Sequence, residues 1–320
     1  IMAGVFLLQS CSLKKNTAAS RRYTEFITRY NIHFNGHEHY VQTLKSMEQN
    51  YEDDYSQILY IHPAEAKANE RAPQPTGDFT RSIEKAQKAI QLRSIKKRPA
   101  RKAGKGNDPA YKAWLKREEY NPFLHNDWLM MGRSQYMNGD FLGAASTFFY
   151  ISKHFGWLPT TVTEAKLWQA LSYCAVDWLF EAESVLERIK DKELTDDNLK
   201  RLYAMAYADL YVRSRKWDKA IPMLDEAARL SKGVQRNRLY FLLGQAYQSS
   251  GDKRMAYEAF KKAGSGGVSY RAKFNARIKQ SEVFDGSDIA PEVKALRGML
   301  KYGRNADYLD QIYYAIGNLY

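Results

Sequence analysis

Three histidines that lie close together in the sequence are the first candidates for metal chemistry. They are His33, His37 and His39, in the stretch HFNGHEH. Two histidines four residues apart can bind one metal ion when they share a helix face. Asn35 and Gly36, however, are typical of a turn, and a turn would separate the two side chains. We therefore expect polar residues near a helix end here, with no metal site and no cofactor.

The acidic residues do not form an obvious catalytic pair. Asp53–Asp54, Glu118–Glu119 and Asp196–Asp197 are each adjacent in sequence, so their carboxylates diverge and do not converge on one substrate. Such residues commonly cap helices or form turns. The sequence also contains no glycine-rich phosphate loop and no Gly-x-Ser-x-Gly motif. We expect a protein that is not an enzyme.

Cys11 is the residue with the clearest covalent chemistry. The apolar run VFLLQS precedes it and two lysines follow shortly after. A free cysteine can be an ordinary buried residue, but a secretory signal also ends in an apolar stretch followed by small residues. The letters LQSC resemble the bacterial lipobox, in which the cysteine becomes the first mature residue and carries lipid. We interpret residues 1–10 as the end of a signal peptide, and the missing basic start indicates a truncated sequence.

Lipid on Cys11 would be the means of membrane attachment. No run of about 20 apolar residues occurs in the sequence, as a membrane-spanning helix would need. The several acyl chains of a bacterial lipoprotein exceed the roughly two signals that stable anchoring requires.

Positive charge is concentrated in one short segment. The formal net charge is +13, and the stretch RSIKKRPARKAGK supplies seven basic residues without an acid. Clustered basic residues can bind nucleic acid, but the lipobox directs the chain out of the cytoplasm. A solvated linker, an acidic protein partner and anionic lipid headgroups remain as interpretations. The residues of this basic patch are Arg93, Lys96, Lys97, Arg98, Arg101, Lys102 and Lys105.

Helical periodicity recurs before the basic patch. Within 20–48, one apolar set that includes Tyr23, Phe26 and Tyr30 is followed by a second set after Asn35 and Gly36, which predicts two helices and a turn. Residues 53–60 read as a link, and the proline-containing stretch after them reads as a loop. A further helix is expected over 79–95, and an exposed linker after it.

Beyond His125 the sequence repeats itself. Aligned alanines occur at Ala144, Ala182, Ala220 and Ala256, with separations of 38, 38 and 36 residues. The pattern matches the tetratricopeptide (TPR) repeat of two antiparallel helices. Small residues such as Gly132 and Gly244 are expected where the two helices cross closely, with aromatic side chains beside them. Gly139 and Gly251 are expected to end the first helices in a left-handed conformation.

These patterns predict an all-α protein. An N-terminal helical segment precedes a right-handed TPR solenoid with four clear repeats, one divergent repeat and one that is cut off. We expect the chain to divide into the signal-peptide end at 1–10, a lipidated helical segment at 11–95, a basic linker at 96–110 and the TPR array at 111–320. An array that stops inside a repeat would leave an apolar face uncovered, so we expect it to continue beyond Tyr320 or to be covered by another subunit.

Several stretches together resemble one family. The lipobox, TRYNIHFNG, DDYSQIL, the TPR units and GRNADYLDQIYYAIGNLY are similar to the PorW/SprE family. These are TPR lipoproteins of the type IX secretion and gliding system of Bacteroidetes.

The resemblance implies a non-enzymatic adaptor on the periplasmic face of the outer membrane. Its partners would be the outer-membrane translocon with its lipoproteins and a PorN/GldN-like component of the periplasmic ring, and it would bind no nucleic acid. The residues after Cys11 lack the acidic residues of a surface-export signal, which also favours the periplasmic face. By the TPR pattern, the protein-binding groove would be lined by Arg133, Tyr136, Asp209, Arg213, Arg238 and Gln245.

Two other families of lipoproteins with TPR helices remain as alternatives. A SusD-like glycan-binding lipoprotein would need exposed aromatic platforms for sugars. A BamD-like assembly lipoprotein would work with a β-barrel insertase.

Overall fold

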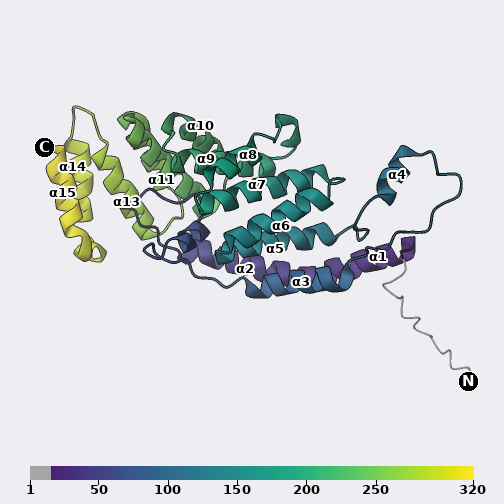
Figure 1. Cartoon of the computed structure of the whole chain (residues 1–320). Helices are drawn as coiled ribbons and strands as arrows, with labels where there is room; N and C mark the ends of the chain where they lie inside the picture. Colours follow the sequence, from purple (N-terminus) through teal and green to yellow (C-terminus); the bar gives the residue numbers. More distant parts are fainter. Residues whose placement is uncertain (1–15) are drawn as a thin grey trace, which may run out of the picture. The chain divides into compact units, whose positions relative to one another are not determined.

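The computed structural model describes residues 16–320, and these form an all-α protein (Figure 1). No strand occurs among the described residues, so the predicted fold class is confirmed at this level. Within the same part of the chain, no helix combines the length and the apolar character that crossing a bilayer requires. The predicted signal peptide and Cys11 lie outside the described residues.

The chain forms two compact units, each built from two stretches of sequence. The first unit contains the described residues up to Thr43 together with Asp78–Ala165. The second contains Leu44–Gly77 together with Lys166–Tyr320. This division differs from the sequence-based one, which placed a linker at 96–110. Two long helices, α2 (Phe34–Asn50) and α7 (Pro159–Ala175), contribute residues to both units.

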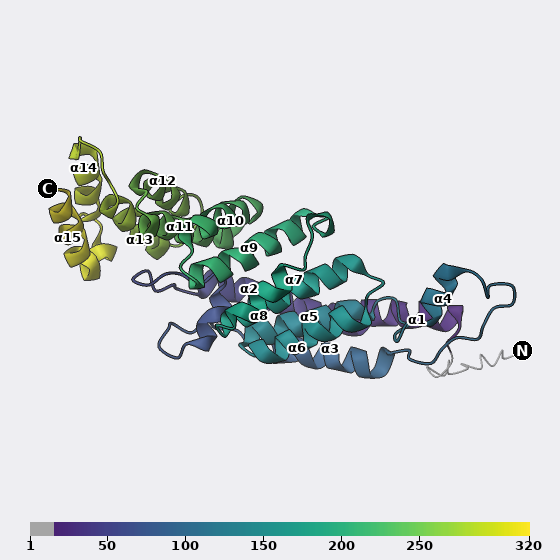
Figure 2. The ribbon, with the colours of Figure 1, turned by 45° about the horizontal axis from the view of Figure 1, so that its top comes forward.

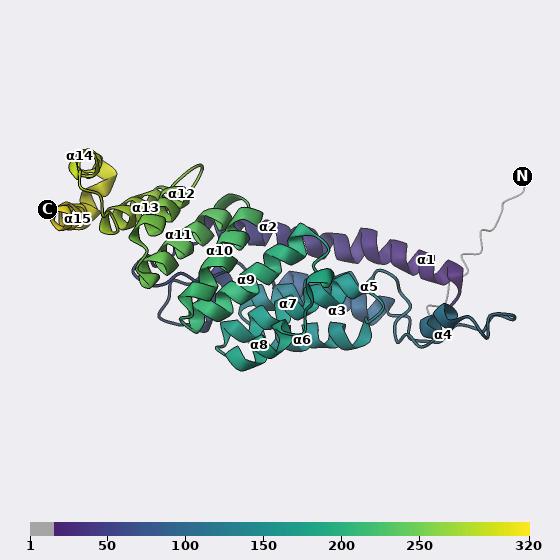
Figure 3. The ribbon, with the colours of Figure 1, turned by 90° about the horizontal axis from the view of Figure 1, so that it is seen from above.

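The first unit is built around packed pairs of helices. Helix α3 packs against α5, and α5 packs against α6. The segments α1, η1 and α2 follow one another without interruption, and Figure 3 shows α1 and α2 along one line. The helices are α1 (Ala18–Ile27), η1 (Thr28–His33, a π-helix), α3 (Thr80–Arg93), α4 (Pro109–Leu115), α5 (Leu124–Asn138) and α6 (Phe141–His154), with the first part of α2.

The expected turn at Asn35 and Gly36 is wrong, because both residues lie inside α2. Glycine serves close packing at this position. A Cβ atom on Gly36 would lie 2.7 Å from Met130 Cε and 3.0 Å from Lys85 Cβ. The Ser82 hydroxyl also donates a hydrogen bond to the Gly36 carbonyl (3.0 Å). Gly36 therefore does not mark a turn. It lets α3 and α5 approach α2 closely.

The second unit is a succession of helices that pack on their neighbours in order. Figure 2 shows α9 to α13 side by side, and α9, α10, α11, α12 and α13 make contact in that sequence. The elements are η2 (Pro63–Ala68), α8 (Leu179–Leu186), η3 (Asp191–Glu193), α9 (Asp197–Arg213), α10 (Trp217–Leu230), α11 (Gly233–Ser250), α12 (Lys253–Ala263), α13 (Tyr270–Glu282), α14 (Ala290–Met299), η4 (Gly303–Tyr308) and α15 (Leu309–Leu319).

The expected close crossings are present in both units. A Cβ on Gly132 would lie 2.7 Å from the Phe148 ring, and a Cβ on Gly244 would lie 2.7 Å from the Phe260 ring. Both rings are fully buried. The four aligned alanines Ala144, Ala182, Ala220 and Ala256 are also fully buried. The small residues of the repeat therefore stand where a second helix leaves no room for a side chain.

The ends of the first helices share one backbone conformation. Gly139 and Gly251 have φ of 87° and 88°, as expected for left-handed C-caps. At the equivalent places the chain has Asp177 (φ 59°) and Arg215 (φ 55°), the two non-glycine residues with positive φ among those described. The turn geometry is therefore kept even where the residue type disfavours it.

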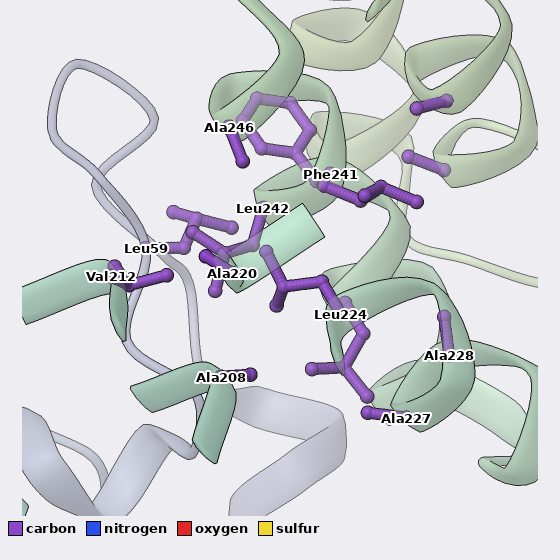
Figure 4. Close-up of a cluster of buried hydrophobic side chains, with 14 of the residues drawn as sticks. Leu59, Ala208, Val212, Ala220, Leu224, Ala227, Ala228, Phe241, Leu242 and Ala246 are labelled. Carbon is purple, nitrogen blue, oxygen red and sulfur yellow. The ribbon is translucent and has the colours of Figure 1, made fainter. Parts of the chain in front are cut away.

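The core of the second unit includes side chains from outside the helices. Leu59 and Ile61, from the stretch before η2, join the buried cluster formed by α9, α10, α11 and α12. Figure 4 shows Leu59 among side chains of this cluster that include Val212 and Leu242. The predicted link at 53–60 thus contributes Leu59 to the core.

Candidate functional site

Residues 51–68 form an extended segment that lies against α9 and α11 of the second unit. Apart from the short helix η2 the segment has no regular secondary structure. Its residues 59 and 61–66 are nevertheless buried. A buried, non-helical backbone needs hydrogen-bond partners for its peptide groups. In this unit, side chains of α11 supply several of them.

Arg238 of α11 makes several charged hydrogen bonds to the 51–68 segment. Its Nε and Nη2 atoms donate to the two carboxylate oxygens of Asp53 (2.7 and 2.6 Å). Nη2 also donates to the Tyr60 carbonyl (3.0 Å). The Arg238 and Asp53 side chains are 8% and 4% exposed. Burial alone would lower the pKa of Arg238, but the Asp53 carboxylate raises it above its ordinary value.

Two glutamines of α11 bind the backbone of the same segment. Gln245 accepts a hydrogen bond from the Leu59 amide (3.0 Å) and donates to the Gln57 carbonyl (2.7 Å). Gln235 donates to the Ile61 carbonyl (2.7 Å). An amide side chain can donate and accept at once, so it pairs with an extended backbone much as a neighbouring strand would. The contacts depend on the backbone and not on the side chains of the segment.

Arg213, at the end of α9, is surrounded by three carboxylates. It donates to Glu65 of the segment, to Asp209 one helical turn earlier and to Asp177, each at 2.8 Å. Glu65 also accepts from the His62 amide (3.0 Å) and thereby caps η2. Burial raises the pKa of Asp209 to about 7 even though Arg213 opposes this shift. One Asp209 oxygen, Oδ2, is buried without a hydrogen-bond partner among the described residues.

His62 begins η2 as a neutral side chain. Its Nδ1 atom accepts a hydrogen bond from the Ala64 amide (3.1 Å). Burial lowers the pKa of His62 to about 3, and the nearby Arg238 and Arg201 charges add to this effect. An imidazole that accepts through Nδ1 must be unprotonated there, so the hydrogen bond and the pKa direction agree.

The structure differs from the expectation of an open groove. Asp209, Arg213, Arg238 and Gln245 all belong to the second unit, and the last three bond directly to the chain's own 51–68 segment. Asp209 is buried behind Arg213. The physical reason is that the segment offers a carboxylate, apolar side chains and backbone groups that match these residues.

The other two predicted groove residues lie in the first unit. Tyr136 is fully buried and packs edge-on against Phe141, so its side chain is not available to a partner. Arg133 forms an ion pair with Glu164. Both residues lie in a helix, α5, as helical periodicity predicted, but periodicity could not show which neighbour covers them.

Asp53, Glu65 and Gln235 complete this network but were not predicted as site residues. Asp53 was assigned to a turn or cap. Its neighbour Asp54 does form such a turn, by accepting from the Ser56 amide (3.0 Å), and Asp196 caps α9 as expected. Glu65 lies between two alanines, but Asp53 lies between Glu52 and Asp54, so the local sequence gave no common signal for these two residues.

An open cleft lies beside the 51–68 segment, with a volume of about 990 Å³. It is lined by residues from the segment, from the loop after it, from the ends of α9 and α11 and from the start of α10. Tyr60 and Trp217 offer aromatic surface, while Arg71 and Arg215 are exposed cations. The cleft therefore presents both apolar and positively charged surface.

The histidine cluster does not form a metal site in the described part of the chain. His33 and His37 stack at 5.7 Å between ring centroids, with His33 Nδ1 3.1 Å from Asp127 Oδ1. His39 Nδ1 lies 3.0 Å from the Ser82 hydroxyl. Residues 16–320 hold no group of three or more His, Cys, Asp or Glu side chains placed for a metal ion.

The basic patch lies largely in solvent. Arg93 ends α3 and is partly buried, whereas Lys96, Lys97, Arg98, Arg101, Lys102 and Lys105 are exposed. Ile95 is buried, and the Glu119 carboxylate accepts from its amide (2.8 Å). The stretch is therefore fixed at its start, where Glu119 caps the backbone.

Comparison with known proteins adds no family assignment. No protein-family model matches the chain, and no curated protein matches it significantly.

Proposed function

We propose that this chain is a lipid-anchored adaptor of the type IX secretion system, held through Cys11 on the periplasmic face of the outer membrane. It would connect the outer-membrane translocon to a PorN/GldN-like component of the periplasmic ring. Its helix pairs would form a right-handed TPR solenoid. The proposal assigns no catalytic step and no cofactor to the chain, and it rests first on the resemblance of the quoted stretches to the PorW/SprE family.

One structural observation supports a binding role. Arg238, Gln235 and Gln245 hold an extended polypeptide by its backbone and by one carboxylate. The polypeptide that these side chains hold is part of the same chain. Because that surface is filled, we assign partner binding to the open cleft beside it, where Arg71, Arg215 and Trp217 are available.

Affinity purification from detergent-solubilised outer membranes tests this proposal. The native chain should recover translocon and ring components. An Arg71→Glu, Arg215→Glu double variant should recover less of them. The matched control is Lys253→Glu, Arg254→Glu, which changes the charge equally at exposed positions on α12 and should recover as much as the native chain. Recovery of a β-barrel insertase or a glycan transporter in place of secretion components would contradict the proposal. A Cys11→Ala variant should leave the outer-membrane fraction unless its partners alone retain it.

A further inference from the structure

In helix α1 and the π-helix η1 of the first unit, the buried side is mostly polar and the exposed side is aromatic, which is the reverse of the usual arrangement. The buried side carries small or polar side chains together with a single large apolar residue. The opposite side carries three exposed aromatic residues, and a fourth follows at the first position of α2. The buried residues are Ser20, Thr24, Thr28 and Ile32. The exposed aromatic residues are Tyr23 (55%), Phe26 (61%), Tyr30 (60%) and Phe34 (53%).

The polar side is held by specific contacts, so the helix cannot simply rotate. The Asn121 amide donates to the Thr28 hydroxyl (3.1 Å), and that hydroxyl donates to the Thr24 carbonyl (2.6 Å). The sequence had indicated the aromatic residues as the apolar side of this helix. The structure corrects the implied burial, because the aromatic side faces away from the rest of its unit. A row of half-exposed aromatic side chains usually marks an interaction surface.

Positive charge gathers where α1 begins. The Asn16 amide donates to the Lys97 carbonyl (2.7 Å), which holds the basic patch beside the start of the helix. Arg21 bonds to Asn16 and lies over the Trp114 ring, 5.0 Å from its centroid. Burial raises the pKa of Tyr120, and the nearby Arg98, Arg117 and Arg21 charges oppose this shift.

We propose that the aromatic side of α1 and η1, together with the basic patch, binds an anionic phospholipid surface. Tyrosine and phenylalanine at the headgroup level, with flanking Arg and Lys, are the composition of interfacial helices. This inference rests on the proposed lipid anchor for its geometry. The chain between Cys11 and Asn16 spans at most about 17 Å, so lipid on Cys11 keeps the start of α1 close to the bilayer.

The surface has a function beyond adhesion. A lipid on Cys11 is a single point of attachment, and one point does not fix the orientation of the protein. Contact along α1 and at the basic patch fixes the first unit against the membrane at two further places. An adaptor that transmits force, or that holds two partners in a fixed position relative to each other, requires a fixed orientation of this kind.

Vesicle co-sedimentation of the full chain with Cys11→Ser tests the surface without the anchor. The protein should bind vesicles of phosphatidylglycerol and phosphatidylcholine but not vesicles of phosphatidylcholine alone, and salt should weaken the binding. Lys96→Gln, Lys97→Gln, Arg98→Gln should reduce the partition coefficient about a hundredfold, since each basic residue near an anionic surface contributes roughly fivefold. The matched control is Lys253→Gln, Arg254→Gln, Lys261→Gln, which changes the net charge equally at exposed positions in the second unit.

A second pair of variants tests the aromatic side. Tyr23→Ser, Phe26→Ser should weaken vesicle binding by about tenfold or more. Phe180→Ser, Tyr302→Ser removes exposed aromatic residues of the second unit and should change nothing. Absence of binding, equal binding to neutral vesicles, or equal losses in test and control variants would overturn the inference. So would unchanged vesicle binding in a Tyr23→Ser, Phe26→Ser variant that instead loses a co-purifying protein. These results are independent of whether secretion components are recovered, which tests the proposed function separately.

Discussion

At the scale of single residues, Arg238 and Asp53 form a buried ion pair within the second unit. Both side chains are nearly fully buried and bond through two parallel hydrogen bonds. Removing one partner of a buried pair leaves the other charge without compensation, which typically costs 3–5 kcal/mol. The pair also joins residues far apart in the chain, so its loss affects the docking of the whole 51–68 segment.

We predict that Arg238→Ala lowers the free energy of unfolding by about 3–5 kcal/mol. Urea denaturation followed by circular dichroism measures this loss. Arg229→Ala is the matched control, because Arg229 pairs with Asp225 at 3.0 Å on the exposed side of α10. An exposed pair one turn apart contributes only about 0.3–0.5 kcal/mol. Equal losses in the two variants would show that the 51–68 segment is not held by Arg238.

Two buried titratable groups near the 51–68 segment should give opposite pH dependences. The raised pKa of Asp209, about 7, means that the folded chain holds this proton more tightly than the unfolded chain. Asp209 therefore favours folding below about pH 4 and loses that contribution as the pH rises to about 7. The lowered pKa of His62, about 3, has the reverse effect. His62 favours folding above about pH 6.5 and loses that contribution as the pH falls.

Single substitutions separate the two effects. Asp209→Asn cannot ionise, so its free energy of unfolding should fall less than that of the native chain between pH 4 and 7. His62→Asn keeps an acceptor for the cap of η2 and should lose less stability on acidification from pH 6.5 to 4. Urea denaturation at several pH values measures both slopes. Parallel pH profiles for the native chain and both variants would contradict the burial of these groups.

At the scale of helices, glycine and aromatic residues determine how closely paired helices approach. Gly244→Ala places a Cβ 2.7 Å from the Phe260 ring, and overpacking of this kind costs about 1–3 kcal/mol. Gly298→Ala in α14 is the control, because nothing lies within 4 Å of its added Cβ. That variant should be neutral or more stable by up to about 1 kcal/mol. Thermal or urea unfolding of both variants decides whether the helix crossing is as close as the structure indicates.

The left-handed turn residues offer a stabilising change. Arg215 has φ of 55° and is exposed, so Arg215→Gly removes backbone strain without uncovering the core. We expect a gain of about 1 kcal/mol. Asp177→Gly removes similar strain but also the ion pair of Asp177 with Arg213, so its gain should be smaller. A loss of stability in Arg215→Gly would mean that the Arg215 side chain makes a favourable contact in solution.

The sequence predicts local structure well at positions where only one physical requirement explains the residue type. Gly132, Gly244 and the four repeat alanines identify close helix crossings, and Gly139 and Gly251 identify helix ends. The same reasoning failed at Gly36, because a glycine needed for close packing and a glycine needed for a turn look alike in one sequence. It could not find Asp177 and Arg215, whose residue types argue against their conformation.

The site could be predicted only in part, because it depends on contacts between residues far apart in the sequence. Periodicity identified Arg213, Arg238 and Gln245 as residues on one side of their helices. Nothing in the local pattern showed that residues 51–68, far earlier in the chain, would cover them. Likewise, the aromatic spacing of α1 predicted a helix correctly but gave no means of telling a core-facing side from an exposed one. In both cases the helix itself was predicted correctly, but the part of the chain that packs against it, or leaves it exposed, was not.

At the scale of the whole molecule, each unit depends on two stretches that are separated in the sequence. The 51–68 segment bonds to side chains of α9 and α11 that lie more than a hundred residues later. The first unit likewise joins residues before Thr43 to Asp78–Ala165. Contacts of such high sequence separation close large loops, and they are expected to slow folding.

If the exposed loop after this segment is cleaved, the two fragments should therefore stay associated. Thr76 and Gly77 are exposed, so a protease recognition sequence inserted between them can be cleaved without disturbing the core. The two fragments should co-elute in size-exclusion chromatography under native conditions and separate in denaturant, because each unit contains residues from both fragments. With Arg238→Ala added, the cut protein should dissociate at a lower urea concentration, whereas Arg229→Ala should leave the midpoint almost unchanged. Fragments that separate in native buffer would contradict the interlocked arrangement of the two stretches in each unit.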